Sequence, residues 1–247
     1  MEKKERLFYR AMAHVAMRPT LGVALKVRSY GLENIPKRGK CLIIANHRTL
    51  TDPLIMAMEI DRPVNWLAAD FNFNIPGVGW LFKNAGVIPL YIAGGGKNEK
   101  TFEKCMRLLQ RGEAVGIYPE GVQNFIDPTG RKIKSFQTGF TRFALATGAP
   151  VIPMALIADG EKILGQTNEP PFSWFSNFDD LGMSEETVID VKIVIYTGKV
   201  VLIAGKPVNL DEYYHQMHTK ELLNHVAGKI RREVIKLYEE GEKILKG

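Results

Sequence analysis

The chain has 247 residues, of which 45% are apolar, and its 33 basic and 27 acidic side chains give a formal net charge of +6. This is enough material for one domain with a sizeable core, and the mild positive charge fits an anionic partner such as a membrane surface, a nucleic acid or a phosphorylated substrate. The two cysteines, Cys41 and Cys105, have no redox or metal-binding spacing, and no run of about 18 apolar residues could span a bilayer, which excludes a disulfide framework and a transmembrane helix.

Residues 1–27 are expected to form an amphipathic two-helix motif that associates with a membrane. Its apolar face is expected to comprise Leu7, Phe8, Ala11, Met12 and Val15, with Arg6, Tyr9 and Arg10 on the opposite side. The pair Arg18-Pro19 is expected to break the first helix. Cationic flanks around an apolar face are typical of helices in the membrane interface, and an amphipathic helix packed on the main domain is the alternative.

Residues 28–247 are expected to form one α/β domain, in which strands and helices alternate. The expected strands are 26–30, 41–46, 64–69, 86–91, 114–119, 151–157, 190–197 and 199–205. The expected helices are 53–60, 98–111, 136–148 and 219–245, the last a solvated outer helix. This alternation predicts a mostly parallel central sheet flanked by helices. A turn at Thr197-Gly198 is expected to make the last two strands an antiparallel hairpin.

A histidine and an aspartate follow the buried strand 41–46. The stretch "ANHRTLTDP" places His47 directly after the apolar run and Asp52 before Pro53, a pair expected to begin a helix with the aspartate as its N-cap. Open α/β sheets place their chemistry at the carboxyl ends of such strands. These residues therefore mark a candidate site, although an ordinary loop histidine and a capping aspartate would give the same pattern.

Two further stretches end or begin at the same expected edge of the sheet. "GIYPEGVQNF" places Glu120 and Gly121 after another buried strand, and "VIPMAL" contains Pro153 within a strand. Because parallel strands present their carboxyl ends at one edge, the histidine, two acids and several glycines are expected to meet in one cleft.

The order of these motifs resembles the glycerolipid acyltransferases of the lysophosphatidic acid acyltransferase type. "NHRTLTD" is similar to the family's His-x4-Asp motif, and "GLENIP", "IPGVGWLFKNAGVIPL", "YPEGVQN", "VIPMAL" and "GKPV" resemble its other elements in the same order. The likeness covers roughly residues 26–210. It implies transfer of a fatty acyl group from acyl carrier protein or coenzyme A to the hydroxyl of a lysophospholipid, with 1-acyl-glycerol-3-phosphate as acceptor and phosphatidic acid as product.

The resemblance also implies roles for individual residues. His47 would be the general base, and Asp52 would orient it, with no metal and no redox cofactor. Glu120, Gly121, Arg48 and Lys134 are candidates for binding the acceptor. Backbone N–H groups near Gly121 or in the "NIPGVG" loop are candidates for stabilising the oxyanion. The motif residues carried over from the family comprise Pro76, Gly77, Gly79 and Pro153.

Three cations that typical members use to bind phosphate are missing. The corresponding positions are Ala69, Gln123, and Tyr91 or Ile92. A phosphate monoester strongly favours charged donors, so either other cations such as Arg48 and Lys134 replace them or the acceptor carries no phosphate.

The partners expected are a phospholipid bilayer, a lysophospholipid and an acyl thioester, and no nucleic acid. No secretory signal is visible, so the expected location is the cytoplasmic face of the cell membrane, with peripheral or monotopic attachment. A non-catalytic, membrane-tethered lipid-binding protein is an alternative. A nucleic-acid binder is suggested only by the positive charge, because the sequence has no helix-turn-helix, RNA-binding aromatic stripe or zinc spacing.

Overall fold

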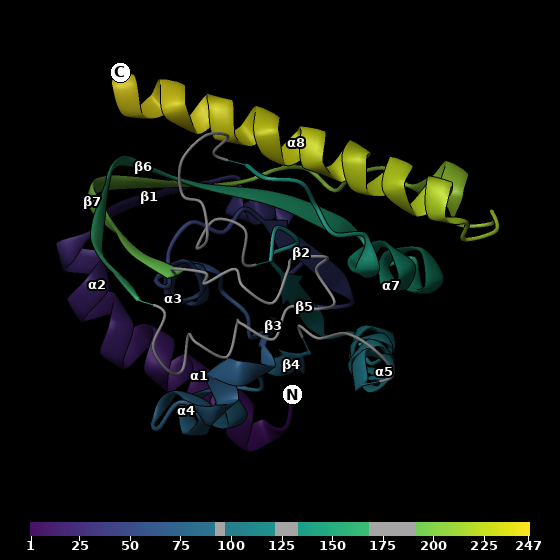
Figure 1. Cartoon of the computed structure of the whole chain (residues 1–247), viewed down its shortest axis with the longest axis horizontal. Coiled ribbons are helices and arrows are strands. Elements are labelled where there is room, and N and C mark those ends of the chain that lie inside the picture. Colours follow the sequence, from purple (N-terminus) through teal and green to yellow (C-terminus); the bar gives the residue numbers. More distant parts are fainter. Residues whose placement is uncertain (92–96, 122–132, 168–190) are drawn as a thin grey trace.

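The computed structural model of this chain describes residues 1–91, 97–121, 133–167 and 191–247 (Figure 1). Its centre is a seven-stranded sheet with the strand order β1-β7-β6-β2-β5-β3-β4. The strands comprise β1 Lys26–Tyr30, β2 Cys41–Ala45, β3 Val64–Ala69, β4 Ile88–Leu90, β5 Ala114–Ile117, β6 Val151–Thr167 and β7 Val191–Ala204. Helices cover both faces of this sheet, so the expected α/β fold is confirmed.

The sheet is mixed, which corrects the expectation of a mostly parallel one. Strand β7 pairs antiparallel with β6 and parallel with β1, so β1 and β7 run against the other strands. The expected hairpin at residues 190–205 is also wrong, because β7 is one continuous strand. Gly198 has a φ of 83° but lies beside a register shift between Ala158 and Gly160, so this glycine serves a β-bulge and not a turn.

The expected helices are present with small shifts at their ends. The main-domain helices comprise α3 Asp52–Glu59, α4 Val78–Asn84, α5 Lys97–Gln110, α7 Gly139–Thr147 and α8 Lys220–Lys246. Helix α4 was not expected, and its first two residues, Val78 and Gly79, belong to the "NIPGVG" segment taken for a loop. Short 3-10 turns comprise η2 Leu32–Asn34, η3 Asp70–Asn74 and η6 Asp211–Tyr213.

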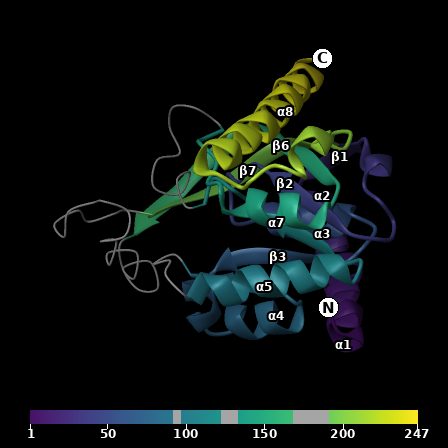
Figure 2. The same cartoon turned by 90° about the vertical axis from the view of Figure 1, so that its right-hand side faces the viewer.

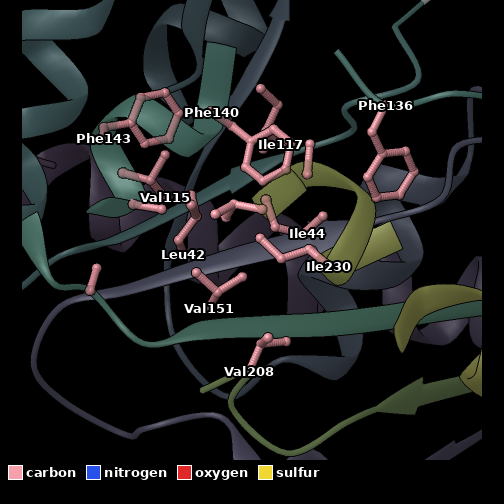
Figure 3. Packing of buried hydrophobic residues seen from close by; sticks show 14 of the residues in the cluster. Leu42, Ile44, Val115, Ile117, Phe136, Phe140, Phe143, Val151, Val208 and Ile230 are labelled. Carbon is pink, nitrogen blue, oxygen red and sulfur yellow. The ribbon is translucent and has the colours of Figure 1, made fainter. Parts of the chain in front are cut away.

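Two hydrophobic cores lie on opposite faces of the sheet. On one face, Leu42 and Ile44 of β2 pack with residues of α5, α7 and α8, and Figure 3 shows part of this cluster with Phe140 and Ile230. On the other face, Ile43 packs with residues of α3 and the N-terminal helices. Successive strand residues point to opposite faces, which explains why the whole of β2 is buried.

The last helix is part of the core and is not the purely solvated helix expected from its charges. Val226, Ile230, Val234 and Tyr238 recur every four residues and are buried. Helix α8 thereby lies across β6 and β7 (Figure 1). Figure 2 shows α5, α7 and α8 together on the face that this view turns forward.

The N-terminal segment is one nearly continuous helical stretch, made of α1 Lys3–Ala11, a π-helix Met12–Met17 and α2 Arg18–Ala24. The predicted break at Arg18-Pro19 is therefore wrong. Pro19 lies in the first turn of α2, where its missing N–H costs little, and the wider preceding π-turn joins the two helices.

The face of this segment that meets the domain also differs from the expected apolar one. Tyr9, expected on the polar side, is buried, as is Ala13, whereas Leu7 and Val15 are 71% and 74% exposed. The packing of Tyr9 and Ala13 into the core makes the segment a part of the domain. Within the described residues, no helix combines the length and apolar character needed to cross a bilayer.

Candidate active site

His47 and Asp52 are in direct contact. The Nδ1 atom of His47 lies 2.8 Å from Oδ2 of Asp52. The same carboxylate oxygen accepts the backbone N–H groups of Arg48 at 2.6 Å and Thr49 at 2.9 Å. Because Oδ2 already accepts these two bonds, the hydrogen in the histidine contact belongs to Nδ1. The proton on Nδ1 makes Nε2 the basic nitrogen of the ring.

The local fold explains how this carboxylate tolerates full burial. Asp52 is 0% exposed and is the first residue of α3, with Thr51 as the N-cap, which corrects the expectation that Asp52 itself is the cap. Its side chain turns back to the preceding loop, where its other oxygen, Oδ1, accepts the hydroxyl of Thr49 at 2.7 Å. These bonds and the positive end of the helix dipole compensate the cost of burying a charge.

Asn46 fixes the point at which His47 leaves the sheet. Strand β2 ends at Ala45, which is in register with Met154 of β6. The Asn46 side chain then takes the place of a backbone group, because its Nδ2 donates to the carbonyl of Leu156 at 2.9 Å and its Oδ1 accepts the N–H of Leu156 at 2.8 Å. The backbone of residue 47 can therefore turn away while the strand pairing remains satisfied.

Glu120 connects the histidine to a second segment of the site. Its side chain is 1% exposed, and its Oε1 accepts the backbone N–H of His47 at 2.9 Å. Its other oxygen, Oε2, accepts the backbone N–H of Lys134. Arg231 of α8 donates to the carbonyls of Ile133 and Lys134, both at 2.7 Å. Glu120 therefore lies at the site, as expected from the sequence, and its carboxylate binds backbone N–H groups of His47 and Lys134.

An aromatic stack supports the imidazole. The ring centroids of Tyr118 and His47 are 4.2 Å apart with an interplanar angle of 23°, and Trp66 also stacks on Tyr118 with a centroid distance of 4.9 Å. Burial raises the pKa of the Tyr118 hydroxyl well above its usual value, and the nearby charge of Asp52 raises it further. Tyr118 therefore stays neutral and presents its π face to the imidazole ring.

Arg48, a candidate acceptor ligand, is held by an acidic residue. Its side chain is 4% exposed, and the guanidinium binds the carboxylate of Glu161 through Nε at 3.1 Å and Nη2 at 2.6 Å. Burial alone would lower the pKa of Arg48, but the bonds to Glu161 and its charge outweigh burial and raise it.

The glycine and proline candidates have local roles. The N–H of Gly121 donates to the carbonyl of Tyr118 at 3.1 Å in a turn where the glycine has a φ of 62°. Gly77 precedes α4 with a φ of 78°, and a Cβ on Gly79 would lie 2.0 Å from the carbonyl oxygen of Phe73. Pro76 lies beside Gly77, and Pro153 is in β6 opposite Ile44. Ile92 and Gln123 lie outside the described residues.

Sequence reasoning missed the residues that surround the dyad. Glu161 lies on the part of β6 beyond the expected strand 151–157, and Tyr196 lies in the expected strand 190–197, whose pairing with β6 was not predicted. The sequence could have indicated Tyr118 as a site residue, because it directly precedes Pro119 and Glu120. Across the described ranges, no group of three or more His, Cys, Asp or Glu side chains is arranged to hold a metal ion.

Comparisons with known proteins agree with this geometry. A model of the Acyltransferase family matches residues 26–157. Curated relatives include a chloroplastic 1-acyl-sn-glycerol-3-phosphate acyltransferase of Brassica napus, 29% identical over 132 residues that cover 53% of this chain and 37% of the relative. The enzyme of the same name from Borreliella burgdorferi is 29% identical over 150 residues, which cover 59% of this chain and 58% of the relative.

A solved structure shares the fold. The crystal structure of the 1-acyl-sn-glycerophosphate (LPA) acyltransferase PlsC from Thermotoga maritima superposes with a TM-score of 0.53 at 22% identity, covering 85% of this chain and 71% of that chain. The matches to the two curated relatives span 37% and 58% of their lengths. Because the family model matches more than half of its residues, this chain belongs to the Acyltransferase family.

Proposed function

We propose that this chain transfers a fatty acyl group from an acyl thioester to the free hydroxyl of a lysophospholipid, with 1-acyl-glycerol-3-phosphate as the leading acceptor and phosphatidic acid as its product. The observation that carries the proposal is the 2.8 Å contact between His47 Nδ1 and the fully buried Asp52 carboxylate. The names of the curated relatives support the same reaction class.

The chemistry follows from this pair. Nε2 of His47 takes the proton of the acceptor hydroxyl as its oxygen attacks the carbonyl carbon of the thioester. Asp52 stabilises the imidazolium formed in this step. The tetrahedral intermediate then collapses, the carbon–sulfur bond breaks, and the departing thiolate takes the proton from His47. Direct transfer of this kind uses no metal, no redox cofactor and no covalent acyl-enzyme.

The acceptor can be identified by incubating purified protein with acyl carrier protein and coenzyme A thioesters and a panel of lysolipids with and without a phosphate group. Mass spectrometry of the lipids would reveal an ester product, and we expect its largest yield with a phosphate-bearing lysolipid. Product from phosphate-free acceptors alone would support the second acceptor class, which the missing cations at Ala69, Ile92 and Gln123 favour. No ester product from any acceptor would favour the non-catalytic lipid-binding alternative.

We also propose that the enzyme attaches peripherally to the cytoplasmic face of the cell membrane through the outer side of its N-terminal segment. Leu7 and Val15 are exposed there, and Trp80 of α4 is 63% exposed and packs edge-on against Phe8. Apolar side chains next to cations such as Arg10 suit an anionic lipid interface.

Deletion of the segment would remove core residues, so point variants test this attachment better. The double variant Leu7→Glu/Val15→Glu is expected to stop co-flotation with vesicles that contain anionic phospholipid. The matched control is Met217→Glu, which changes an 83% exposed residue of a different segment and is expected to float normally. Flotation of the double variant at the level of the unmodified protein would refute this attachment.

A further inference from the structure

Strands β6 and β7 continue beyond the strands that flank them and form a two-stranded arm. We use the name β6–β7 arm for residues 160–167 and 191–197, which pair with each other, whereas β6 pairs with β2 only from Val151 to Met154. Figure 2 shows this arm projecting away from the rest of the sheet. The arm begins close to the dyad, because Glu161 of β6 is the partner of Arg48.

Arg48 links this arm to the catalytic loop, the name used here for residues 46–51 between β2 and α3. Its backbone contacts Asp52 at the end of this loop, and its side chain contacts the arm. Its backbone N–H donates to Oδ2 of Asp52 at 2.6 Å, and its side chain makes the two bonds with Glu161. Two parallel charge-assisted bonds to one carboxylate fix the orientation of a guanidinium as well as its position. The side chain that is locked in this way belongs to the residue immediately after His47.

The same part of the arm also covers the aspartate. Tyr196 is in register with Glu161 across the arm, and both lie on one face of the pair. Tyr196 is buried, and Asp52 is close enough for its charge to act on the phenol. Tyr238 of α8 is likewise close enough to Glu161 and Arg48 to sense their charges. The ion pair therefore lies between the catalytic loop, the arm and α8.

This inference rests on the proposed function. We propose that Glu161 is a positioning residue for the acyl-transfer dyad, His47 and Asp52. By holding Arg48, it fixes the loop whose N–H groups and histidine bind Asp52. Arg48 then acts as a link between the arm and the dyad. This differs from the expectation that Arg48 binds the acceptor, because the two guanidinium nitrogens Nε and Nη2 are committed to Glu161.

The test compares Glu161→Gln with Lys162→Gln. Lys162 is the next residue on the same strand and is exposed, so its variant controls for a changed side chain on the arm. Loss of the charge-assisted bonds is expected to lower kcat by about 10-fold to 100-fold in Glu161→Gln with the KM of the acceptor unchanged. Lys162→Gln is expected to retain the kcat and KM of the unmodified protein.

A readout without substrate separates this proposal from the acyltransferase proposal. The ring signals of His47 in a substrate-free NMR spectrum are expected to shift in Glu161→Gln and to stay in place in Lys162→Gln. If the unmodified protein transferred no acyl group, the proposed function would be refuted. The His47 signals would still show whether Glu161 positions the ring. Unchanged His47 signals in Glu161→Gln would overturn the positioning role.

Two other outcomes would also overturn the positioning role of Glu161. A lower KM for phosphate-bearing acceptors in Glu161→Gln would make Arg48 an acceptor ligand with which Glu161 competes. A lower Tm with an unchanged kcat would make the pair merely structural. If Glu161→Gln does not fold, the double variant Arg48→Met/Glu161→Met removes both charges, so that no buried guanidinium is left without its partner, and it is expected to show the same fall in kcat.

Discussion

Replacing Asp52 by asparagine removes one negative charge from the site and little of its shape. An asparagine carbonyl can still accept the N–H groups of Arg48 and Thr49 that now bond to Oδ2. The amide cannot provide the charge that stabilises a protonated His47. The ring and the carboxylate are in contact through atoms 2.8 Å apart, so their charge centres lie roughly 4 Å apart.

The size of the effect follows from this separation. Two unit charges at 4 Å interact by about 4 kcal/mol at an effective dielectric constant of about 20, which corresponds to about a thousandfold in rate. We therefore expect Asp52→Asn to lower kcat by about 10³-fold while the acceptor KM changes little, because Asp52 is fully buried.

The assay follows thiol release from the acyl donor and confirms the ester product by mass spectrometry. Asp61→Asn, the same substitution at an exposed position just beyond the other end of α3, is the matched control and is expected to behave as the unmodified protein. Circular dichroism would verify that both variants fold. A folded Asp52→Asn variant with a kcat within tenfold of the unmodified protein would refute the electrostatic role of the carboxylate.

Two further substitutions test neighbouring parts of the account. Tyr118→Leu removes the ring stacked on His47 and is expected to lower kcat, whereas Tyr118→Phe keeps the ring and is expected to match the unmodified protein. Equal kcat values for the two variants would show that the stacked ring is unimportant. Burial raises the pKa of Tyr9 from 10.0 to about 12, so between these pH values the unfolded chain loses a proton that the folded chain keeps, and stability falls with rising pH by up to about 3 kcal/mol. Tyr9→Phe is expected to remove this part of the alkaline loss in denaturant titrations at pH 9 and pH 12, and an identical loss in both proteins would contradict the assignment.

The contact between His47 and Asp52 could be predicted from the sequence because its determinants are local. A fully apolar strand followed at once by a histidine, and a helix start five residues later, place both side chains within one short loop. Glu120 was located for a similar reason, since it follows a second buried strand in the same sheet. The spacing of the apolar residues in α8 also indicates its buried face, but the many charges of this helix led to the prediction of a solvated helix.

The surroundings of the pair could not be predicted because they depend on contacts distant in sequence. Glu161 reaches Arg48 across 113 residues, and the arm that carries it has exposed residues such as Ile163 and Leu164 that no core pattern would assign to a strand. Gly198 looked like a turn residue because a positive φ serves turns and bulges equally well. The burial of Tyr9 and Ala13 of the N-terminal segment could not be predicted because it depends on the domain beneath them.

The central claim is that the imidazole of His47 removes the proton from the acceptor hydroxyl. The most direct measurement is the turnover number of His47→Ala with the best donor and acceptor pair, beside His218→Ala, which changes an exposed histidine. The account predicts that His47→Ala folds normally and loses at least about 10³-fold in kcat, while His218→Ala is unaffected. Turnover of folded His47→Ala at a rate close to that of the unmodified protein would contradict the account.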